Sequence, residues 1–184
     1  MKIITGTMKG RNFYMPAGIR PTQNITRKAV FDLLGQSMEG MRFVDIFAGS
    51  GAVGLEALSC GAESVVFVEK DPKCVQVIEK NCDFLAIPPS QYRILENDGF
   101  AAIKAFSRGG EKFDCVFIDP PYGPQLAKKA LKTLEAYDIL QPNCVAVIQH
   151  DKREILPEEL GRIFRSKARN YGSTTVSIYQ AKAL

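Results

Sequence analysis

Cysteine and histidine are both scarce in this 184-residue sequence, and their arrangement argues against a metal site or a disulfide framework. The five cysteines are odd in number, lie mostly within apolar segments and form no C-x-x-C pair. We therefore expect buried thiols in a reducing cytosol, with no bound metal. The single histidine, His150, follows an apolar run at what we interpret as a strand end, and we assign it no catalytic role.

The sequence also lacks any apolar run close to the roughly 20 residues that a membrane-spanning helix requires. Its first residues lead at once into glycine and basic residues, which is not the pattern of a signal peptide. We expect a cytoplasmic monomer with no membrane partner. Because 46% of the residues are hydrophobic and 24% are charged, we interpret 1–184 as a single domain with one core.

Acidic residues are few in one part of the chain, which concentrates the net charge of +4 near the N-terminus. Residues 1–42 contain seven lysines and arginines against two acids, whereas the remaining 142 residues contain 17 bases and 18 acids. We treat 1–40 as a basic N-terminal extension of a core that spans 41–184. Such a segment is either a solvated surface or an arm that binds a polyanion, and the composition leaves both open.

Short apolar runs alternate along the chain with segments of helical periodicity, as in a doubly wound α/β protein. The runs are rich in Val, Ile and Phe, which is typical of parallel strands covered on both faces. We predict strands at 42–47, 64–69, 92–96, 114–119 and 144–149. In the segments between them, apolar residues recur at intervals of three and four, which predicts helices at 51–61, 71–85, 98–106 and 124–140.

Both ends of the chain depart from this alternation. Two extended runs, 163–168 and 174–181, are joined by turn residues with no helix between them, which predicts an antiparallel hairpin at the sheet edge. Residues 1–15 predict a small hairpin, and 24–38 an amphipathic helix. The predicted fold is a Rossmann-like, doubly wound, seven-stranded and mostly parallel sheet with an antiparallel C-terminal hairpin strand, preceded by a small N-terminal β-hairpin and helix.

A glycine-rich segment, Gly49-Ser50-Gly51-Ala52-Val53-Gly54, follows the first predicted strand and opens a helix. Glycines there allow the backbone to approach a ligand closely, and Glu69 at the end of the second strand suits a ribose diol. This context favours a nucleoside-containing cofactor over a plain tight turn. The glycines alone do not distinguish NAD from S-adenosylmethionine.

Two carboxylates favour S-adenosylmethionine. Asp45 lies in the strand just before the glycine loop, where it would attract the ammonium group of that cofactor but oppose a pyrophosphate. Asp98-Gly99-Phe100, just after the third strand, offers a carboxylate for an adenine amino group and an aromatic ring to lie on the base. Asp98 is equally explained as the N-cap of the helix that follows, and the sequence leaves both roles open.

The tetrad Asp119-Pro120-Pro121-Tyr122 ends the fourth predicted strand, so it should face the same crevice as the glycine loop. The exocyclic amine of a nucleobase is a poor nucleophile, because its lone pair is delocalised into the ring. The Asp119 carboxylate and the Pro120 carbonyl would accept its N–H bonds and turn the lone pair toward a methyl donor. Proline keeps this backbone stiff, and Tyr122 offers a face on which the base can stack. A turn without function is the alternative.

At these residues the chain resembles the class I S-adenosylmethionine-dependent methyltransferases that act on exocyclic amino groups. More closely, it resembles the bacterial family that methylates the N2 amine of guanine in 16S ribosomal RNA. The resemblance covers most of residues 1–150, and the Arg-Pro-Thr segment at 20–22 is its specific part. The matching stretches are MKIITGTMKGRNF, RPTQNITRKAVFDLL, DIFAGSGAVGLEALSCGA, VEKD and IDPPY.

The resemblance implies S-adenosylmethionine as the cofactor and ribosomal RNA as the partner, either free or within a small-subunit assembly particle. The cofactor-binding residues that the resemblance implies are Asp45, Gly49, Gly51, Glu69 and Asp98, and we add Lys70, Gly99 and Phe100 beside them to the predicted set. The residues implied to hold the guanine are Asp119, Pro120, Pro121 and Tyr122. The RNA-side residues that the resemblance implies are Arg20, Thr22 and Arg27, and we add Lys9 and Arg11 of the basic extension to the predicted set. The chain departs from the family pattern at Lys28, where an acid is usual, and at Gln149, where Glu is frequent.

Three other functions are weighed against this one. An amino methyltransferase of DNA or other RNA, acting on adenine N6 or cytosine N4, is the nearest, although a DNA enzyme would normally carry a separate sequence-reading domain. An NAD-dependent oxidoreductase would need a pyrophosphate path and a catalytic proton donor. A cofactor-free RNA-binding module would leave the glycine loop and the tetrad unexplained. We favour methyl transfer to guanine N2. In this hypothesis the basic extension binds RNA phosphates, and the target guanine is turned out of its base stack toward the tetrad.

Overall fold

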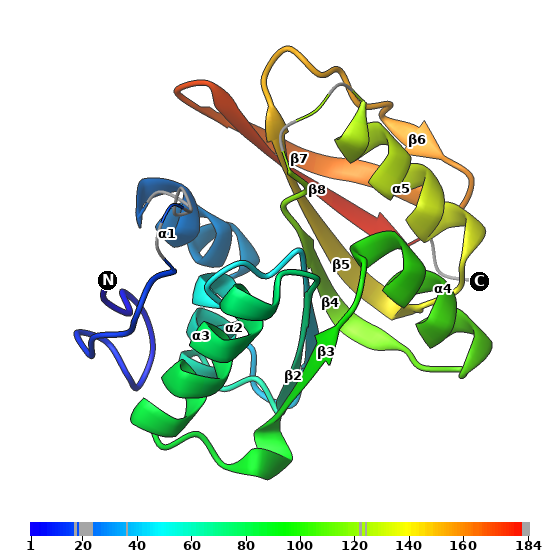
Figure 1. Cartoon of the computed structure of the whole chain (residues 1–184). Helices are drawn as coiled ribbons and strands as arrows, with labels where there is room; N and C mark the ends of the chain where they lie inside the picture. The colour runs from blue at the N-terminus through cyan, green and yellow to red at the C-terminus, as the bar shows by residue number, and fades with distance from the viewer. Residues whose placement is uncertain (17, 19–23, 36, 122, 124, 182–184) are drawn as a thin grey trace.

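A computed structural model describes residues 1–16, 18, 24–35, 37–121, 123 and 125–181 of the protein. Figure 1 shows the described elements as two helical layers around one sheet. The elements are α1 (Asn24–Leu34), β1 (Arg42–Ile46), α2 (Ala52–Ser59), β2 (Ser64–Glu69), α3 (Pro72–Phe84), the 3-10 helix η1 (Pro89–Gln91), β3 (Tyr92–Glu96), α4 (Gly99–Arg108), β4 (Phe113–Ile118), α5 (Leu126–Ala136), β5 (Leu140–Asp151), β6 (Glu159–Leu160), β7 (Ile163–Tyr171) and β8 (Thr174–Ala181).

The strands form one sheet in the order β3-β2-β1-β4-β5-β8-β7-β6. The strands from β3 to β5 in this order run parallel, whereas β8, β7 and β6 pair in antiparallel fashion. The order of the parallel strands reverses at β1, which has β2 on one side and β4 on the other. In open α/β sheets, ligands bind outside the carboxyl ends of the strands at such a switch point. The ends of β1 and β4 are therefore where a site is expected.

Alternate residues of the central strands face two different hydrophobic layers. Phe43 and Phe67 belong to a cluster with residues of α1, α2 and α3, whereas Val44 and Val68 belong to a cluster with residues of α4 and α5. Figure 1 shows these two groups of helices on opposite faces of the sheet. Because both faces are covered, the strands are apolar almost throughout, which explains the continuous hydrophobic runs in the sequence.

The structure confirms a Rossmann-like, mostly parallel sheet with antiparallel C-terminal strands, and it corrects two details. The sheet has eight strands rather than seven, because the two-residue strand β6 pairs with β7. The predicted N-terminal hairpin is present as an antiparallel bridge between Lys2 and Asn12, flanked by backbone hydrogen bonds of Ile3 with Arg11 and of Phe13 with Met1. The helix predicted at 24–38 ends at Leu34, and Gly35 follows with a left-handed φ of 87°.

The cysteines are free thiols, and all but Cys60 are buried. Burial raises the pKa of the Cys74 thiol to about 11, with the nearby charges of Glu69 and Asp71 acting in the same direction. In the part of the chain that the structure describes, no helix is long and apolar enough to cross a membrane. The same residues contain no cluster of three or more His, Cys, Asp or Glu side chains that could hold a metal ion.

The N-terminal segment is bound to α2 through a buried carboxylate. Glu56, which is fully buried, accepts hydrogen bonds from the backbone N–H groups of Ile4 at 2.8 Å and Thr5 at 3.0 Å. Arg27 of α1 pairs with the same carboxylate at 3.1 Å and donates to the backbone carbonyl of Lys2 at 2.6 Å. Burial lowers the pKa of Arg27, and the negative charge of Glu56 opposes that shift. One ion pair thus joins three segments that are distant in the sequence.

We expect Arg27→Met to lower the free energy of unfolding by about 3–5 kcal/mol, because it leaves the Glu56 carboxylate buried without its charged partner. Lys28→Met is the matched control, since Lys28 is exposed and pairs with Asp32 on the helix surface, and its loss should stay below about 1 kcal/mol. Urea unfolding followed by circular dichroism measures both. Equal losses in the two variants would show that this ion pair does not hold the N-terminal segment.

Candidate functional site

Three carboxylates meet at the carboxyl ends of neighbouring strands. Asp45 lies in β1, Glu69 ends β2, and Asp119 directly follows β4. The strand register pairs Asp45 with Phe67 on one side and with Phe117 on the other. Glu69 and Asp119 each lie two residues beyond those partners, so all three acids come to the same edge of the sheet. This edge is the switch point at which a ligand site is expected.

Asp45 is the most buried of the three acids, with 1% of its surface exposed. Its Oδ2 atom accepts a hydrogen bond from the backbone N–H of Gly54 at 2.9 Å. Burial raises the pKa of Asp45 to about 7; the Gly54 bond opposes this shift, and the charges of Asp119 and Glu69 add to it. The carboxyl group therefore changes its protonation near neutral pH, and a positive charge beside it would favour the ionised form.

The glycine loop between β1 and α2 is held by Glu69. The Oε2 atom of Glu69 accepts from the backbone N–H of Gly49 at 2.8 Å, and its Oε1 atom accepts from those of Lys70 at 2.8 Å and Asp71 at 2.9 Å. Gly49 and Gly51 adopt left-handed φ angles of 57° and 76°, which residues with side chains rarely adopt. Glu69 thus shapes the loop and the turn after β2, and Oε2 keeps a second lone pair for a ligand hydroxyl.

The start of α4 packs on the end of β1 through two phenylalanines. Phe47 has a left-handed φ of 66°, and its ring makes an edge contact with the Phe100 ring at 5.3 Å between centroids. A Cβ atom on Gly99 would lie 2.6 Å from the Phe47 ring, so a larger residue would displace that ring. Asp98 caps α4, because its Oδ1 atom accepts from the backbone N–H groups of Phe100 and Ala101 at 3.0 Å each. Phe47 was not among the residues predicted from the sequence, although it shortly precedes the glycine loop.

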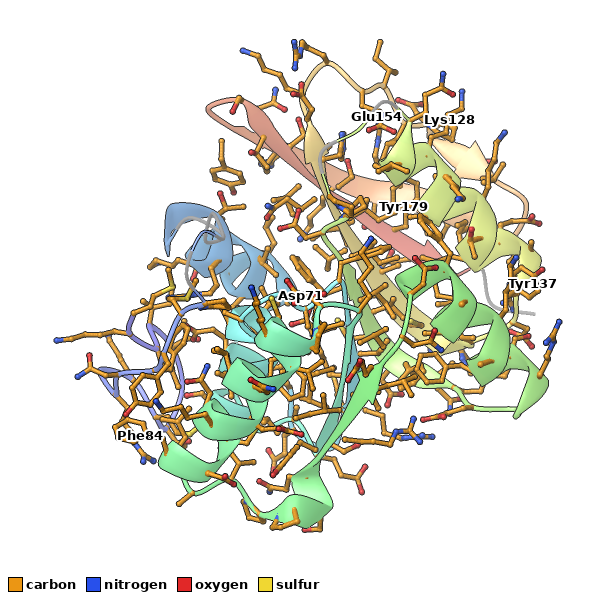
Figure 2. All side chains as sticks on the ribbon, in the orientation of Figure 1. Asp71, Phe84, Lys128, Tyr137, Glu154 and Tyr179 are labelled. Atoms are coloured by element: carbon orange, nitrogen blue, oxygen red, sulfur yellow. The ribbon has the colours of Figure 1, made fainter. Side chains whose placement is uncertain are left out.

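Asp119, Pro120 and Pro121 line a cavity of about 650 Å³ beside the end of β4. The first turn of α5 and the last residues of β5 form its other walls. Figure 2 shows Lys128 of α5 and Glu154 on this side of the molecule, where the Glu154 carboxylate accepts from the Lys128 backbone N–H at 2.9 Å. The last residue of the predicted tetrad, Tyr122, lies outside the residues that the structure describes.

Gln149 of β5 holds the Asp119 carboxylate. The Nε2 atom of Gln149 donates a hydrogen bond to Asp119 Oδ2 at 2.9 Å, and Gln149 is 7% exposed. This contact was not predicted from the sequence, although a polar residue directly after an apolar run was the available signal. The neighbouring His150 is also buried; its Nε2 atom lies 2.9 Å from the Ser177 hydroxyl, and burial lowers its pKa.

The predicted RNA-side residues do not form one group in the described part of the chain. Lys9 is exposed. Arg11 is exposed as well, but it donates to the backbone carbonyls of Leu85 at 3.0 Å and Phe84 at 3.3 Å, at the C-terminal end of α3. Figure 2 shows Phe84 and Asp71 at opposite ends of α3. Arg11 therefore lies at the end of this helix that is remote from the glycine loop.

Arg27 corrects the sequence-based expectation of a residue that lines the RNA side. Its side chain is fully buried and paired with Glu56, so it is not available to phosphates in the folded protein. The basic character of the surrounding segment suggested a surface position, but the acid that neutralises Arg27 lies far away in the sequence, in α2. The other two predicted residues, Arg20 and Thr22, lie outside the described residues.

Comparisons with known proteins cover almost the whole chain. Residues 1–180 match the family described as conserved hypothetical protein 95. The chain is 34% identical over 184 residues to YlbH of Bacillus subtilis (strain 168), covering 99% of this chain and 100% of YlbH. It is 30% identical over 184 residues to ribosomal RNA small subunit methyltransferase D of Haemophilus influenzae, covering 98% of this chain and 93% of that protein. A solved structure of a Thermus thermophilus protein superimposes with a TM-score of 0.84 at 32% identity, covering 97% of this chain and 98% of that one.

The raised pKa of Asp45 predicts how stability changes with pH. An acid with a folded-state pKa of about 7, above its ordinary value of 3.8, stabilises the fold while protonated and loses this contribution as pH rises toward 7. We expect wild type to lose about 2–3 kcal/mol relative to Asp45→Asn between pH 5 and pH 8. Asn can still accept from Gly54, so the variant retains that bond. Denaturant unfolding at several pH values measures the difference, and parallel pH curves would contradict the prediction.

Proposed function

The chain belongs to the family described as conserved hypothetical protein 95, and on this premise we propose that it transfers a methyl group from S-adenosylmethionine to the N2 amine of a guanine in small-subunit ribosomal RNA. Its fold is that of the class I S-adenosylmethionine-dependent methyltransferases. The observation that carries the proposal is the position of Asp119-Pro120-Pro121 at the switch point, beside the Glu69-bound glycine loop and open to a cavity.

The names of the relatives support the substrate class. The Haemophilus influenzae relative is named as a methyltransferase of small-subunit ribosomal RNA. YlbH of Bacillus subtilis is provisionally named an rRNA methyltransferase, without a stated subunit. Both are covered over more than nine-tenths of their length, so the shared region includes the whole of the candidate site. We therefore propose ribosomal RNA as the partner, free or within a small-subunit assembly particle.

The charge at the switch point fits a ligand that carries a sulfonium and an ammonium group. Asp45, Glu69 and Asp119 place negative charge close together, and their repulsion contributes to the raised pKa of Asp45. A cation among them would relieve this repulsion, whereas the pyrophosphate of NAD would increase it. We propose that Asp45 faces the ammonium group of S-adenosylmethionine and that Glu69 accepts its ribose hydroxyls through Oε2.

The residues that follow β3 complete the proposed cofactor site. Asp98 uses Oδ1 for the helix cap, which leaves Oδ2 for the adenine amino group. The ammonium group of Lys129 lies 4.2 Å from the centroid of the Phe100 ring, so the adenine would take the remaining face of that ring. The proposed cofactor-binding set is unchanged from the sequence: Asp45, Gly49, Gly51, Glu69, Lys70, Asp98, Gly99 and Phe100.

In the proposed reaction the protein holds the amine in line with the methyl group. When bound, S-adenosylmethionine supplies a methyl group on a positively charged sulfur. The Asp119 carboxylate and the Pro120 carbonyl accept the N–H bonds of the amine and direct its lone pair at the methyl carbon. The cofactor would supply the methyl group and keep the bonding electrons on its sulfur, and Asp119 would take up the surplus proton of the methylated amine. The fixed φ of proline keeps the accepting carbonyl in place.

The approach of RNA to the cavity rests on the exposed basic residues. Lys2 and Lys9 of the N-terminal segment are exposed, and the Arg153 side chain beside the cavity is 84% exposed while it pairs with Asp151. We propose that these side chains neutralise phosphates and so position the strand without selecting its sequence. Arg20 and Thr22, outside the described residues, stay in this proposed set together with Arg11.

We expect Asp119→Ala to bind S-adenosylhomocysteine normally but to transfer methyl groups at least about 100-fold more slowly, because its proposed partner is the base amine. The matched control is Asp83→Ala, which removes an exposed carboxylate on α3 and should leave both properties unchanged. Incorporation of labelled methyl into small-subunit RNA measures transfer, and calorimetry measures binding. A parallel loss of binding and transfer would instead give Asp119 a structural role.

Ligand-induced stabilisation separates the two candidate cofactors. S-adenosylhomocysteine at 100 times its dissociation constant should add about 2.7 kcal/mol to the free energy of unfolding, and NAD should add nothing. Glu69→Gln should weaken S-adenosylhomocysteine binding about tenfold, because a charged acceptor is lost, whereas the exposed Glu63→Gln should not. Stabilisation by NAD alone, measured by thermal shift, would refute the methyltransferase proposal.

A further inference from the structure

One buried acceptor in the cavity wall has no hydrogen-bond partner among the residues that the structure describes. Gln149 is 7% exposed and lines the same cavity as Asp119 and Pro120. Its Oε1 atom is buried and accepts no hydrogen bond from any of these described residues. Buried side-chain acceptors are nearly always satisfied, because an unpaired one has lost its water without replacement. The Oε1 atom of Gln149 is therefore a candidate ligand contact.

The orientation of the Gln149 amide follows from the charge of its neighbour. Its Nε2 atom donates to Asp119 Oδ2 at 2.9 Å. An ionised carboxylate can only accept hydrogen bonds, so the amide nitrogen and not the amide oxygen must face Asp119. Exchanging the two amide atoms would bring two acceptors together. The unpaired group of Gln149 is consequently an acceptor, and a ligand that satisfies it must bring an N–H or O–H donor.

The strand register places this acceptor next to the proposed amine site. Ile118 of β4 pairs with Ile148 of β5, and Asp119 and Gln149 are the next residues on the two strands. Asp119, Pro120 and Gln149 all line this cavity, so the unpaired Oε1 of Gln149 adds a third acceptor to the two already proposed for the amine, the Asp119 carboxylate and the Pro120 carbonyl. A base that satisfies them all must donate from its exocyclic amine and from an adjacent ring nitrogen.

Among adenine, cytosine and guanine, only guanine has an amine and an adjacent ring N–H donor together on its Watson–Crick edge. Guanine donates from the N2 amine and from the neighbouring N1–H. Adenine and cytosine have an amine beside a ring nitrogen that accepts, so that nitrogen would face Gln149 Oε1 as a second acceptor. A site built around a buried acceptor rejects an analogue that lacks the matching donor, because the acceptor is then left unpaired.

We propose that Gln149 is the residue that selects guanine, with Oε1 accepting from guanine N1–H while Nε2 holds the Asp119 carboxylate against the N2 amine. This inference rests on the proposed function, which it refines by assigning the choice of base to one side chain. Asp119 and Pro120 by themselves accept from any exocyclic amine. Gln149 adds the contact at the ring nitrogen, and the same amide joins base recognition to the placement of Asp119.

The test compares two RNA substrates that differ at positions 1 and 6 of one base. The nucleotide methylated by wild type is first located by mass spectrometry, and the RNA is then prepared with guanine or with 2-aminopurine at that position. 2-Aminopurine keeps the 2-amine but lacks the 6-oxo group and has an accepting N1 in place of N1–H. The contact at N1 is therefore reported by the change in preference that Gln149→Leu causes, and not by the wild-type preference alone. We expect wild type to prefer guanine by at least about 100-fold in kcat/KM. We expect Gln149→Leu to lose rate on guanine and to reduce this preference to less than about tenfold.

Gln180→Leu is the matched control, because Gln180 of β8 is exposed and pairs with Val145, away from the cavity end of β5. Its rate and its preference for guanine should equal those of wild type. An unchanged preference in Gln149→Leu, with its rate lowered equally on both RNAs, would overturn the inference and leave Gln149 a structural role. Absence of methyl transfer by wild type to either RNA would refute the proposed function itself and this inference with it.

A second variant gives a readout that packing alone would not produce. Gln149→Glu keeps an oxygen acceptor but places a second carboxyl group against Asp119, so the pair should share one proton. The protonated pair can reproduce the contacts of the amide, and we expect guanine preference to be retained at low pH. Loss of the shared proton should lower the rate as pH rises, in a step that wild type lacks. A pH–rate profile equal to that of wild type would overturn the contact with Asp119 and the inference built on it.

Discussion

Burial of the Asp45 carboxyl group beside the carboxylates of Glu69 and Asp119 is the constraint around which the site is arranged. Parallel pairing of β1 with β2 and β4 brings the three acids to one edge of the sheet, and burial of Asp45 makes their repulsion stronger. Each acid is held by an N–H donor from a different element; the donors are Gly54, Gly49 and Gln149. The fold thus fixes the direction of each carboxylate while leaving a net negative charge that suits a positively charged ligand.

Much of the fold follows from local patterns that the sequence displays directly. Continuous apolar runs marked the five parallel strands because both faces of the sheet are covered. The start of α3 was marked by Asp71-Pro72, and the Asp71 side chain indeed accepts from the Lys73 backbone N–H. The order of the acids and the glycine loop along the chain predicted that they would come to one edge of the sheet, because each follows or ends a parallel strand, and the strand register places them there.

Features that depend on a distant partner were not predictable in the same way. A positive side chain in a basic segment is usually solvated, and only the folded chain shows that Arg27 meets Glu56 in the core. The contact of Gln149 with Asp119 depends on the register between β5 and β4, which no local pattern specifies. Likewise, the two-residue strand β6 exists only because the edge of β7 is there to pair with it. Such features require knowledge of which segments become neighbours.

The position of β8 constrains the order in which the sheet can be completed. This strand follows β7 along the chain, yet it lies between β5 and β7. During synthesis, β7 therefore emerges before the strand that will separate it from β5, and the outer edge of β5 stays unpaired until β8 has been made. An unpaired strand edge is a template for wrong pairing, either with β7 or with another chain. The wall of the site that β5 provides is thus completed only after β8, which follows β7 in the chain, has been made.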